Sequence, residues 1–96
     1  TAIFACNDDM AVAVLQEARA RGIGIPEDLS VVGFDDVTIS RITVPAITTV
    51  RQPFEEIGRM AVTLLTRMIE GQTVDPLRLV MGARLVVRDS TAPVRS

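Results

Sequence analysis

The chain has 96 residues, of which 48% are apolar, and it carries 10 basic and 12 acidic side chains for a net charge of −2. This length suits one small domain, the apolar content excludes a disordered chain, and the single Cys excludes a disulfide-stapled one. His, Lys, Tyr and Trp are absent, so every cationic side chain is an Arg. The arginines do not cluster, which disfavours nucleic-acid binding, and without His or Lys the chain lacks the commonest general base and any Schiff-base amine.

The first third of the sequence predicts a strand, a helix and a second strand. Residues 1–6 form an almost unbroken apolar run, which is typical of a strand buried on both faces of a parallel sheet. Residues 10–21 show helical spacing, with Gly22 as the expected stop. The apolar stripe of this helix comprises Ala11, Val14, Leu15 and Ala18. A second apolar run at 29–34 completes a βαβ unit, which should be parallel and right-handed.

The middle of the sequence predicts a loop, a strand and a long helix. Residues 37–46 show no clear period and are expected to form a loop, and the β-branched run at 47–51 predicts a short third strand. A helix is expected to begin with Pro53 as its first residue and to end before Gly71. Its apolar stripe comprises Phe54, Ile57, Ala61, Leu64, Leu65 and Met68. Burial of six such side chains would contribute roughly ten kcal/mol gross, so we expect the stripe to hold this helix against a core.

The last part of the sequence predicts further β structure and a tail. Residues 77–87 are apolar and rich in β-forming side chains, and Gly82 in their middle predicts a bend or a bulge. Residues 90–96 are expected to form a polar tail. The predicted elements together indicate the α/β class, with an open, mainly parallel sheet flanked by helices.

Polar side chains follow each of the three predicted strands. Asn7 comes after the first strand, Asp35 and Asp36 come after the second, and Arg51 and Gln52 lie at the end of the third. Because ligands of open parallel sheets bind beyond the carboxyl ends of the strands, these residues form a candidate ligand site. A carboxylate and two amides suit a ligand rich in hydroxyl groups or ring nitrogens. They do not suit a phosphate, which is usually held by a Gly-rich loop.

Each candidate residue also has an ordinary structural explanation. Asn7 or Asp8 can act as the N-cap of the first helix, Asp35 can form a turn, and Gln52 simply precedes a proline. Cys6 is expected to be an inert, buried thiol at the end of a strand. The sequence contains neither a Cys/His ligand spacing nor a loop of alternating oxygen ligands, so we expect no metal, no other cofactor and no catalytic residue.

Four segments of the sequence resemble motifs of the LacI/GalR-type bacterial transcriptional regulators. Ala5–Ala11 resembles the family's Asn-Asp-x-Met-Ala segment, and Gly24–Asp36, which ends in Val-Val-Gly-Phe-Asp-Asp, is similar to its most recognisable stretch. Pro45–Pro53 is similar to the family's Pro-x-Leu-Thr-Thr-(Val/Ile)-x-Gln segment, and Arg88–Pro93 matches its usual ending. The motifs occur in the family's order and spacing over essentially the whole chain, so together they are highly specific.

The resemblance implies a periplasmic-binding-protein-like effector domain, in which two α/β subdomains hold a small molecule in the cleft between them. Residues 1–96 are expected to be a fragment of the C-terminal subdomain, with the helix-turn-helix and the N-terminal subdomain absent. Effector binding would shift the two subdomains and change operator affinity. DNA would then be contacted only through the missing N-terminal region.

The resemblance also implies roles for particular residues. Asp35, Asn7 and Gln52 match positions that contact the small-molecule effector, which we expect to be a sugar or a related metabolite. A second set of positions matches the family's homodimer interface, which would explain apolar side chains in a loop and off the helical stripe. The expected interface comprises Val12, Ile39, Arg41, Ile42 and Val44.

The same resemblance implies a cytoplasmic protein without a membrane partner, and no apolar run in the sequence approaches the ~18 residues of a membrane span.

Two alternative functions stay open. A sugar-binding protein of the same fold that serves a transporter would share this region, and its N-terminal sequence would distinguish it. A small α/β enzyme could use Asp35 or Asp36 as an acid or a base, although the missing His, Lys and Tyr argue against it.

Overall fold

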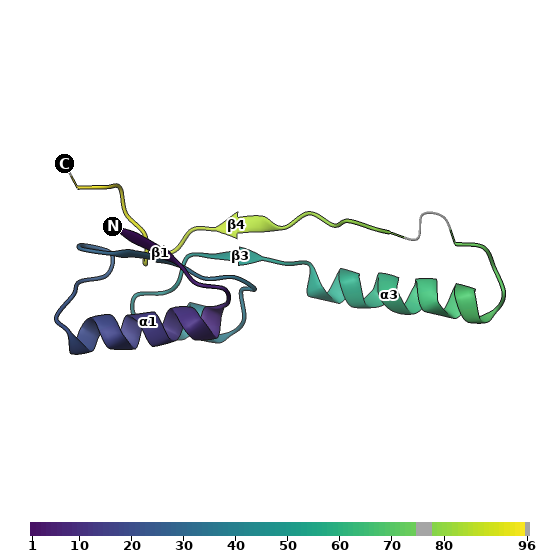
Figure 1. Ribbon diagram of the computed structural model, residues 1–96, viewed down its shortest axis with the longest axis horizontal. Helices are drawn as coiled ribbons and strands as arrows, with labels where there is room; N and C mark the ends of the chain where they lie inside the picture. Colours follow the sequence, from purple (N-terminus) through teal and green to yellow (C-terminus); the bar gives the residue numbers. More distant parts are fainter. Residues whose placement is uncertain (75–77, 96) are drawn as a thin grey trace. The chain divides into compact units, whose positions relative to one another are not determined.

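The computed structural model describes residues 1–74 and 78–95. In chain order the elements are β1 (Ala2–Phe4), α1 (Asp8–Ala20), β2 (Ser30–Val32), α2 (Ile39–Ile42), β3 (Thr49–Arg51), α3 (Phe54–Ile69) and β4 (Arg84–Val86) (Figure 1). They fall into two compact units. The larger unit comprises Thr1–Arg51 and Arg84–Ser96, and the smaller unit comprises Gln52–Ala83.

Parallel pairing organises the strands of the larger unit, as the sequence predicts. β1 and β2 are parallel, and α1 connects them as a βαβ unit and packs against β2. Beyond β2, parallel bridges join Val32 to Thr48 and Asp35 to Arg51, so the segment around β3 lies next in the same direction. β4 pairs with β3 in the antiparallel sense. The prediction of an α/β fold with a mainly parallel sheet is therefore confirmed.

The helix α1 forms where its spacing predicts it and begins two residues earlier. Asn7 is the N-cap, because its Oδ1 accepts a hydrogen bond from the backbone N–H of Met10 at 2.8 Å. Gly22 follows the helix with a φ of 71°, a left-handed conformation that glycine adopts without strain. The predicted stripe is buried except for Val14, which is half-buried. The core cluster comprises Ala5, Ala11, Leu15, Val31 and Ile47.

The first strand differs from its prediction in its burial. The sequence predicts a strand that is covered on both faces, but Ile3 is exposed and Phe4 is 66% exposed. Among the described residues β1 pairs only with β2, so it lies at the edge of the sheet without a second neighbouring strand. Cys6 lies in the connection to α1 and is also exposed, so the prediction of a buried thiol is wrong.

The segment that the sequence predicts as a loop contains a short helix, α2. Ser40 inside this helix is fully buried, and its backbone N–H donates to Val37 O at 3.0 Å. Its carbonyl oxygen accepts from Ile47 N–H at 2.8 Å, which fastens α2 to the residues just before β3. A single helical turn is too short to show the 3.6-residue period, and for this reason the apolar pattern does not reveal it.

The residues around Ser90 are built into the larger unit and do not form a tail. Ser90 is fully buried, and its Oγ donates to Val31 O at 2.6 Å and accepts from Thr48 N–H at 2.8 Å. Its carbonyl oxygen accepts from Val31 N–H at 2.9 Å. The prediction of a polar tail from residue 90 onward is therefore wrong at its start, because the serine hydroxyl completes hydrogen bonds between strands.

The helix of the smaller unit forms as predicted, but its apolar stripe is not buried. α3 begins at Phe54, directly after Pro53, and Gly71 follows its end with a φ of 79°. None of the described α3 residues is buried, and Phe54 and Leu65 are 51% and 57% exposed. The roughly ten kcal/mol expected from this stripe is therefore not realised by contacts among the described residues.

The strand predicted over residues 77–87 is much shorter in the structure. β4 covers only Arg84–Val86, residues 78–83 carry no strand, and residue 77 lies outside the described residues. Its antiparallel partner, β3, is itself only three residues long. The ladder ends where the partner ends, and the apolar sequence on either side cannot extend it.

Candidate ligand site

Two of the three predicted ligand residues lie at the carboxyl ends of neighbouring parallel strands. Asn7 follows β1 and Asp35 follows β2, and both are half-buried. Asp35 pairs with Arg51 at the end of β3 in a parallel bridge, and its N–H donates to Val50 O at 2.9 Å. We call Asn7, Asp35 and Arg51 the strand-end edge. Ligands of parallel sheets bind at such an edge.

Asn7 and Gln52 have different structural roles. The Oδ1 atom of Asn7 caps α1, so the ordinary structural explanation of this residue is confirmed, and a ligand would be held through its Nδ2 group. Gln52 directly follows β3 and begins the smaller unit, where its carbonyl oxygen accepts from Phe54 N–H at 2.9 Å. The ligand roles of both residues stay predictions.

The backbone at residues 35–36 adopts a conformation that few side chains allow. The φ angle is 110° at Asp35 and 61° at Asp36, and both values lie in the region that favours glycine. Two consecutive non-glycine residues of this kind form a strained turn, which persists only where surrounding contacts hold it. We call these two residues the left-handed turn.

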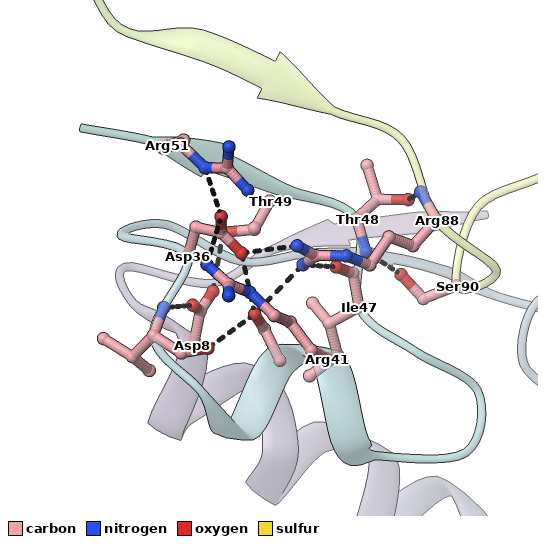
Figure 2. A network of polar contacts seen from close by, with 11 residues as sticks. Asp8, Asp36, Arg41, Ile47, Thr48, Thr49, Arg51, Arg88 and Ser90 are labelled. Atoms are coloured by element: carbon pink, nitrogen blue, oxygen red, sulfur yellow. Dashed lines mark hydrogen bonds and ion pairs between the residues drawn. The ribbon is translucent and has the colours of Figure 1, made fainter. Parts of the chain in front are cut away.

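Asp36 lies at the centre of a polar network that joins three segments of the chain (Figure 2). Its side chain is fully buried. Its Oδ1 accepts from Arg88 Nη2 at 2.6 Å, and its Oδ2 accepts from Arg51 Nε at 2.5 Å and from Arg41 Nη2 at 3.3 Å. The hydroxyl of Ser40 also lies 3.1 Å from Oδ1. One carboxylate therefore receives donors from α2, from β3 and from the residues after β4.

Burial and hydrogen bonding act in opposite directions on the pKa of Asp36. Burial raises the pKa, because it removes water from the charged form. The hydrogen bonds from the three arginines and from Ser40 outweigh burial and hold the pKa of Asp36 well below its usual range. A carboxylate of this kind is too weak a base and too rarely protonated for acid–base catalysis near neutral pH. This disfavours Asp36 as the acid or base of an enzyme.

Asp8 forms a second buried polar centre at the start of α1. The residue is fully buried, its Oδ1 accepts from Thr49 Oγ1 at 2.6 Å, and its Oδ2 accepts from Val37 N–H at 2.8 Å. Its own N–H donates to Phe34 O at 3.0 Å. Gly33 passes so close that a Cβ there would overlap Asp8 Oδ1. Asp8 therefore ties α1 to the residues after β2 and to β3.

The residues predicted to form a dimer interface are only partly covered within the chain. Ile42 and Val44 are 67% and 78% exposed, and the Arg41 side chain is 54% exposed. Val12 and Ile39 are half-buried. Val12 and Val44 line the same cavity of about 290 Å³, so α1 and the segment after α2 lie side by side. Exposed apolar groups gathered in this way are typical of an interaction surface.

The two buried networks escape prediction from sequence pattern because their members are far apart in the chain. Arg88 donates to Ser40 Oγ at 3.0 Å across 48 positions, and no local signal indicates that both residues contact Asp36. Asp8 carries a local signal for a helix start, where a negative charge is favourable. Its contact with Thr49, 41 positions away, has no such signal.

Comparison with known proteins agrees with this geometry. The family model described as a periplasmic binding protein-like domain matches residues 1–91. The HTH-type transcriptional regulator DegA of Bacillus subtilis is 42% identical over 96 residues, which are 100% of this chain and 28% of DegA. A solved complex of the transcriptional regulator CelR with cellobiose has a TM-score of 0.89 at 45% identity, over 93% of this chain and 27% of that one. The lac repressor dimer bound to operator and the anti-inducer ONPF has a TM-score of 0.89 at 32% identity, over 97% of this chain and 32% of that one.

The mainly parallel sheet and its polar strand-end edge define a domain of the periplasmic-binding-protein-like class. The chain belongs to this family, in the form found in LacI/GalR-type bacterial transcriptional regulators, and it matches part of their effector domain. It spans 27–32% of the length of the relatives described above. Within the part of the chain that the structure describes, no helix is both long and apolar enough to cross a bilayer.

Proposed function

We propose that this chain is the effector-sensing part of a LacI/GalR-type transcriptional regulator and that it binds a sugar or a related polar metabolite. The strand-end edge carries this proposal, because a carboxylate and an amide at neighbouring strand ends suit hydroxyl groups. A relative of 45% identity, CelR, has been solved with cellobiose, which supports the sugar class. Residues 1–96 then belong to the C-terminal effector subdomain, and a ligand role for Gln52 rests on its sequence motif alone.

Under this proposal the chain neither makes nor breaks a covalent bond. The effector binds one arrangement of the effector domain more tightly than another and so changes the affinity of the whole protein for its operator. DNA is contacted by a region outside residues 1–96, and the protein acts in the cytoplasm, where its operator lies. The names of the relatives DegA and CelR are those of transcriptional regulators, which favours this function over a transporter-associated sugar-binding protein.

Replacement of Asp35 by Ala in the full-length protein is expected to weaken sugar binding by about 10–150-fold, because the variant loses one charge-assisted hydrogen bond to the sugar. Titration calorimetry with cellobiose, D-xylulose, glucose and adenosine measures the affinity. The comparison distinguishes a sugar effector from an effector that is bound through its ring nitrogens. Because φ at Asp35 is 110°, Ala would add backbone strain. Asp35→Asn tolerates this conformation better and isolates the effect of the charge.

The matched control for Asp35 is Asp9→Asn. Asp9 is an exposed carboxylate in the first turn of α1, and its replacement should leave the affinity unchanged. Wild-type affinity in Asp35→Asn would show that Asp35 is not a ligand contact. Binding of adenosine without any sugar would move the effector to a different chemical class.

We also propose that Val12, Ile39, Arg41, Ile42 and Val44 form a homodimer interface. Val44→Asp is expected to raise the dimer dissociation constant by about tenfold or more, because burial of one Val contributes about 1.5–3 kcal/mol. Sedimentation velocity of the full-length protein over a concentration series measures this constant. Ala13→Asp, on the exposed side of α1, is the control and should leave it unchanged. Equal dissociation constants for wild type and Val44→Asp would place the interface elsewhere.

A further inference from the structure

We propose that Asp36 is a positioning residue for the strand-end edge: its carboxylate holds the left-handed turn and so fixes the direction in which the Asp35 side chain leaves the backbone. This inference rests on the proposed function, because it gives Asp36 a role in presenting Asp35 to the sugar. Asp36 does not itself contact the sugar. Its side chain is fully buried, and both of its oxygens accept hydrogen bonds from within the chain.

The left-handed turn needs an anchor on each side. Conformations of this kind cost free energy in non-glycine residues and persist only where several contacts determine them. On one side, the backbone N–H of Asp35 donates to Val50 O at 2.9 Å. On the other side, the side chain of Asp36 accepts the hydrogen bonds of three arginines from three segments of the chain.

Arg51 links the two residues of the turn directly. Its backbone pairs with Asp35 in the parallel bridge, and its Nε donates to Asp36 Oδ2 at 2.5 Å. Arg88, whose side chain is only 15% exposed, holds the other carboxylate oxygen at 2.6 Å. Since the two oxygens are held from different segments, the carboxylate cannot rotate without breaking a charge-assisted bond. The turn is therefore fixed at its second residue, and Asp35 is fixed with it.

A neutral side chain of the same shape cannot replace this carboxylate. Asn carries one acceptor oxygen and one NH₂ group, so at position 36 its NH₂ would face an arginine donor on one side. Asp36→Asn therefore releases the anchor with little change in volume, and Asn still tolerates a positive φ. The variant separates the anchoring charge from the backbone preference of the residue.

The test compares amide hydrogen exchange at Asp35 and at Ala5 in the full-length wild type and Asp36→Asn. The N–H of Ala5 donates to Val32 O at 2.8 Å and reports on the larger unit away from the turn. We expect exchange at Asp35 to become about tenfold faster or more relative to Ala5, and cellobiose affinity by calorimetry to fall by a similar factor. Asp28→Asn is the control, because Asp28 pairs with Arg95 at 3.1 Å outside the turn, and it should change neither value.

Two results would overturn this inference. Equal acceleration at Asp35 and Ala5 would show that Asp36 only stabilises the unit, and unchanged exchange at Asp35 would show that the turn needs no anchor. If Asp36→Asn does not fold, Arg51→Gln gives the exchange comparison alone, because it removes the Nε bond and leaves the carboxylate in place but also changes the strand-end edge itself.

The two readouts also separate the inference from the proposed function. Faster exchange at Asp35 in a protein that binds no sugar would overturn the proposed function and leave the positioning role intact. Sugar binding that depends on Asp35 but not on Asp36, with unchanged exchange at Asp35, would overturn the positioning role alone.

Discussion

The Asp36→Ala variant is expected to lose about 3–5 kcal/mol of unfolding free energy, the usual cost of removing one partner from a buried ion pair. The variant leaves three guanidinium groups without their shared acceptor, whereas the Ser40 hydroxyl keeps Val37 O as an acceptor at 2.7 Å. Arg88 is affected most, because its side chain is 15% exposed, whereas the Arg41 side chain is 54% exposed and can turn to water. Urea denaturation followed by circular dichroism measures the change.

The control for Asp36 is an ion pair on the surface. Glu17 accepts from Arg21 Nε at 2.6 Å, the same distance as between Arg88 and Asp36, but both side chains of this surface pair are mostly exposed. Glu17→Ala should therefore cost at most about 1 kcal/mol. Similar losses in the two variants would contradict the claim that burial decides the contribution.

The stability that Asp36 contributes should also depend on pH in a defined direction. Its folded-state pKa lies below the value of about 3.9 that a free Asp shows when the chain unfolds. The contribution is therefore fully present above the unfolded-state pKa and is lost as the pH falls toward the folded-state pKa. The difference in unfolding free energy between wild type and Asp36→Ala should shrink from pH 6 to pH 3, and a constant difference over that range would contradict the assignment.

The Asp8→Ala variant has the second largest expected effect, a loss of about 2–4 kcal/mol. The buried hydroxyl of Thr49 loses its acceptor, which costs about 1–3 kcal/mol, and the part-buried N–H of Val37 loses a hydrogen bond worth about 1 kcal/mol. The same urea experiment measures the loss. Asp9→Ala is the matched control, because Asp9 stands in the same first turn of α1 but is exposed. It should lose only the helix-dipole contribution of about 0.3–1 kcal/mol.

Gly33→Ala tests the same centre from the other side. A Cβ at position 33 would overlap Asp8 Oδ1, so the carboxylate must leave its two donors or the strand must move. Overpacking of this kind costs about 1–3 kcal/mol. Gly82→Ala is the control, because a Cβ there meets no atom within 4 Å. Equal stability of Gly33→Ala and wild type would contradict the close approach.

The βαβ unit was predictable from the sequence because its signals are local. The apolar runs before Asn7 and before Asp35, and the helical stripe between them, each occupy neighbouring positions in the chain. The end of α1 was equally predictable, since Gly22 adopts the left-handed conformation for which glycine is suited. The placement of Asn7 and Asp35 beyond parallel strands followed from these elements.

The remaining features depend on partners that the sequence does not indicate locally. Ser90 is buried because its hydroxyl lies between Val31 and Thr48, which are 59 and 42 positions away. The stripe of α3 predicts a buried helix face, but none of the described α3 residues is buried, because burial depends on which surface is available to cover the stripe. The network of Asp36 likewise depends on Arg88, 52 positions later.

The buried position of Ser90 has a consequence for the order in which the chain folds. Val31 and Thr48 emerge early during synthesis, but the hydroxyl and carbonyl that join them belong to Ser90, which is made 59 and 42 positions later. Likewise, β3 can pair with β4 only after the whole smaller unit, which lies between them in the chain, has been made. Closing so long a loop costs conformational entropy, and this cost arises before the long-range hydrogen bonds have formed. A nascent chain released before residue 90 would therefore carry an open sheet, with Val31 and Thr48 exposed to pairing by another molecule.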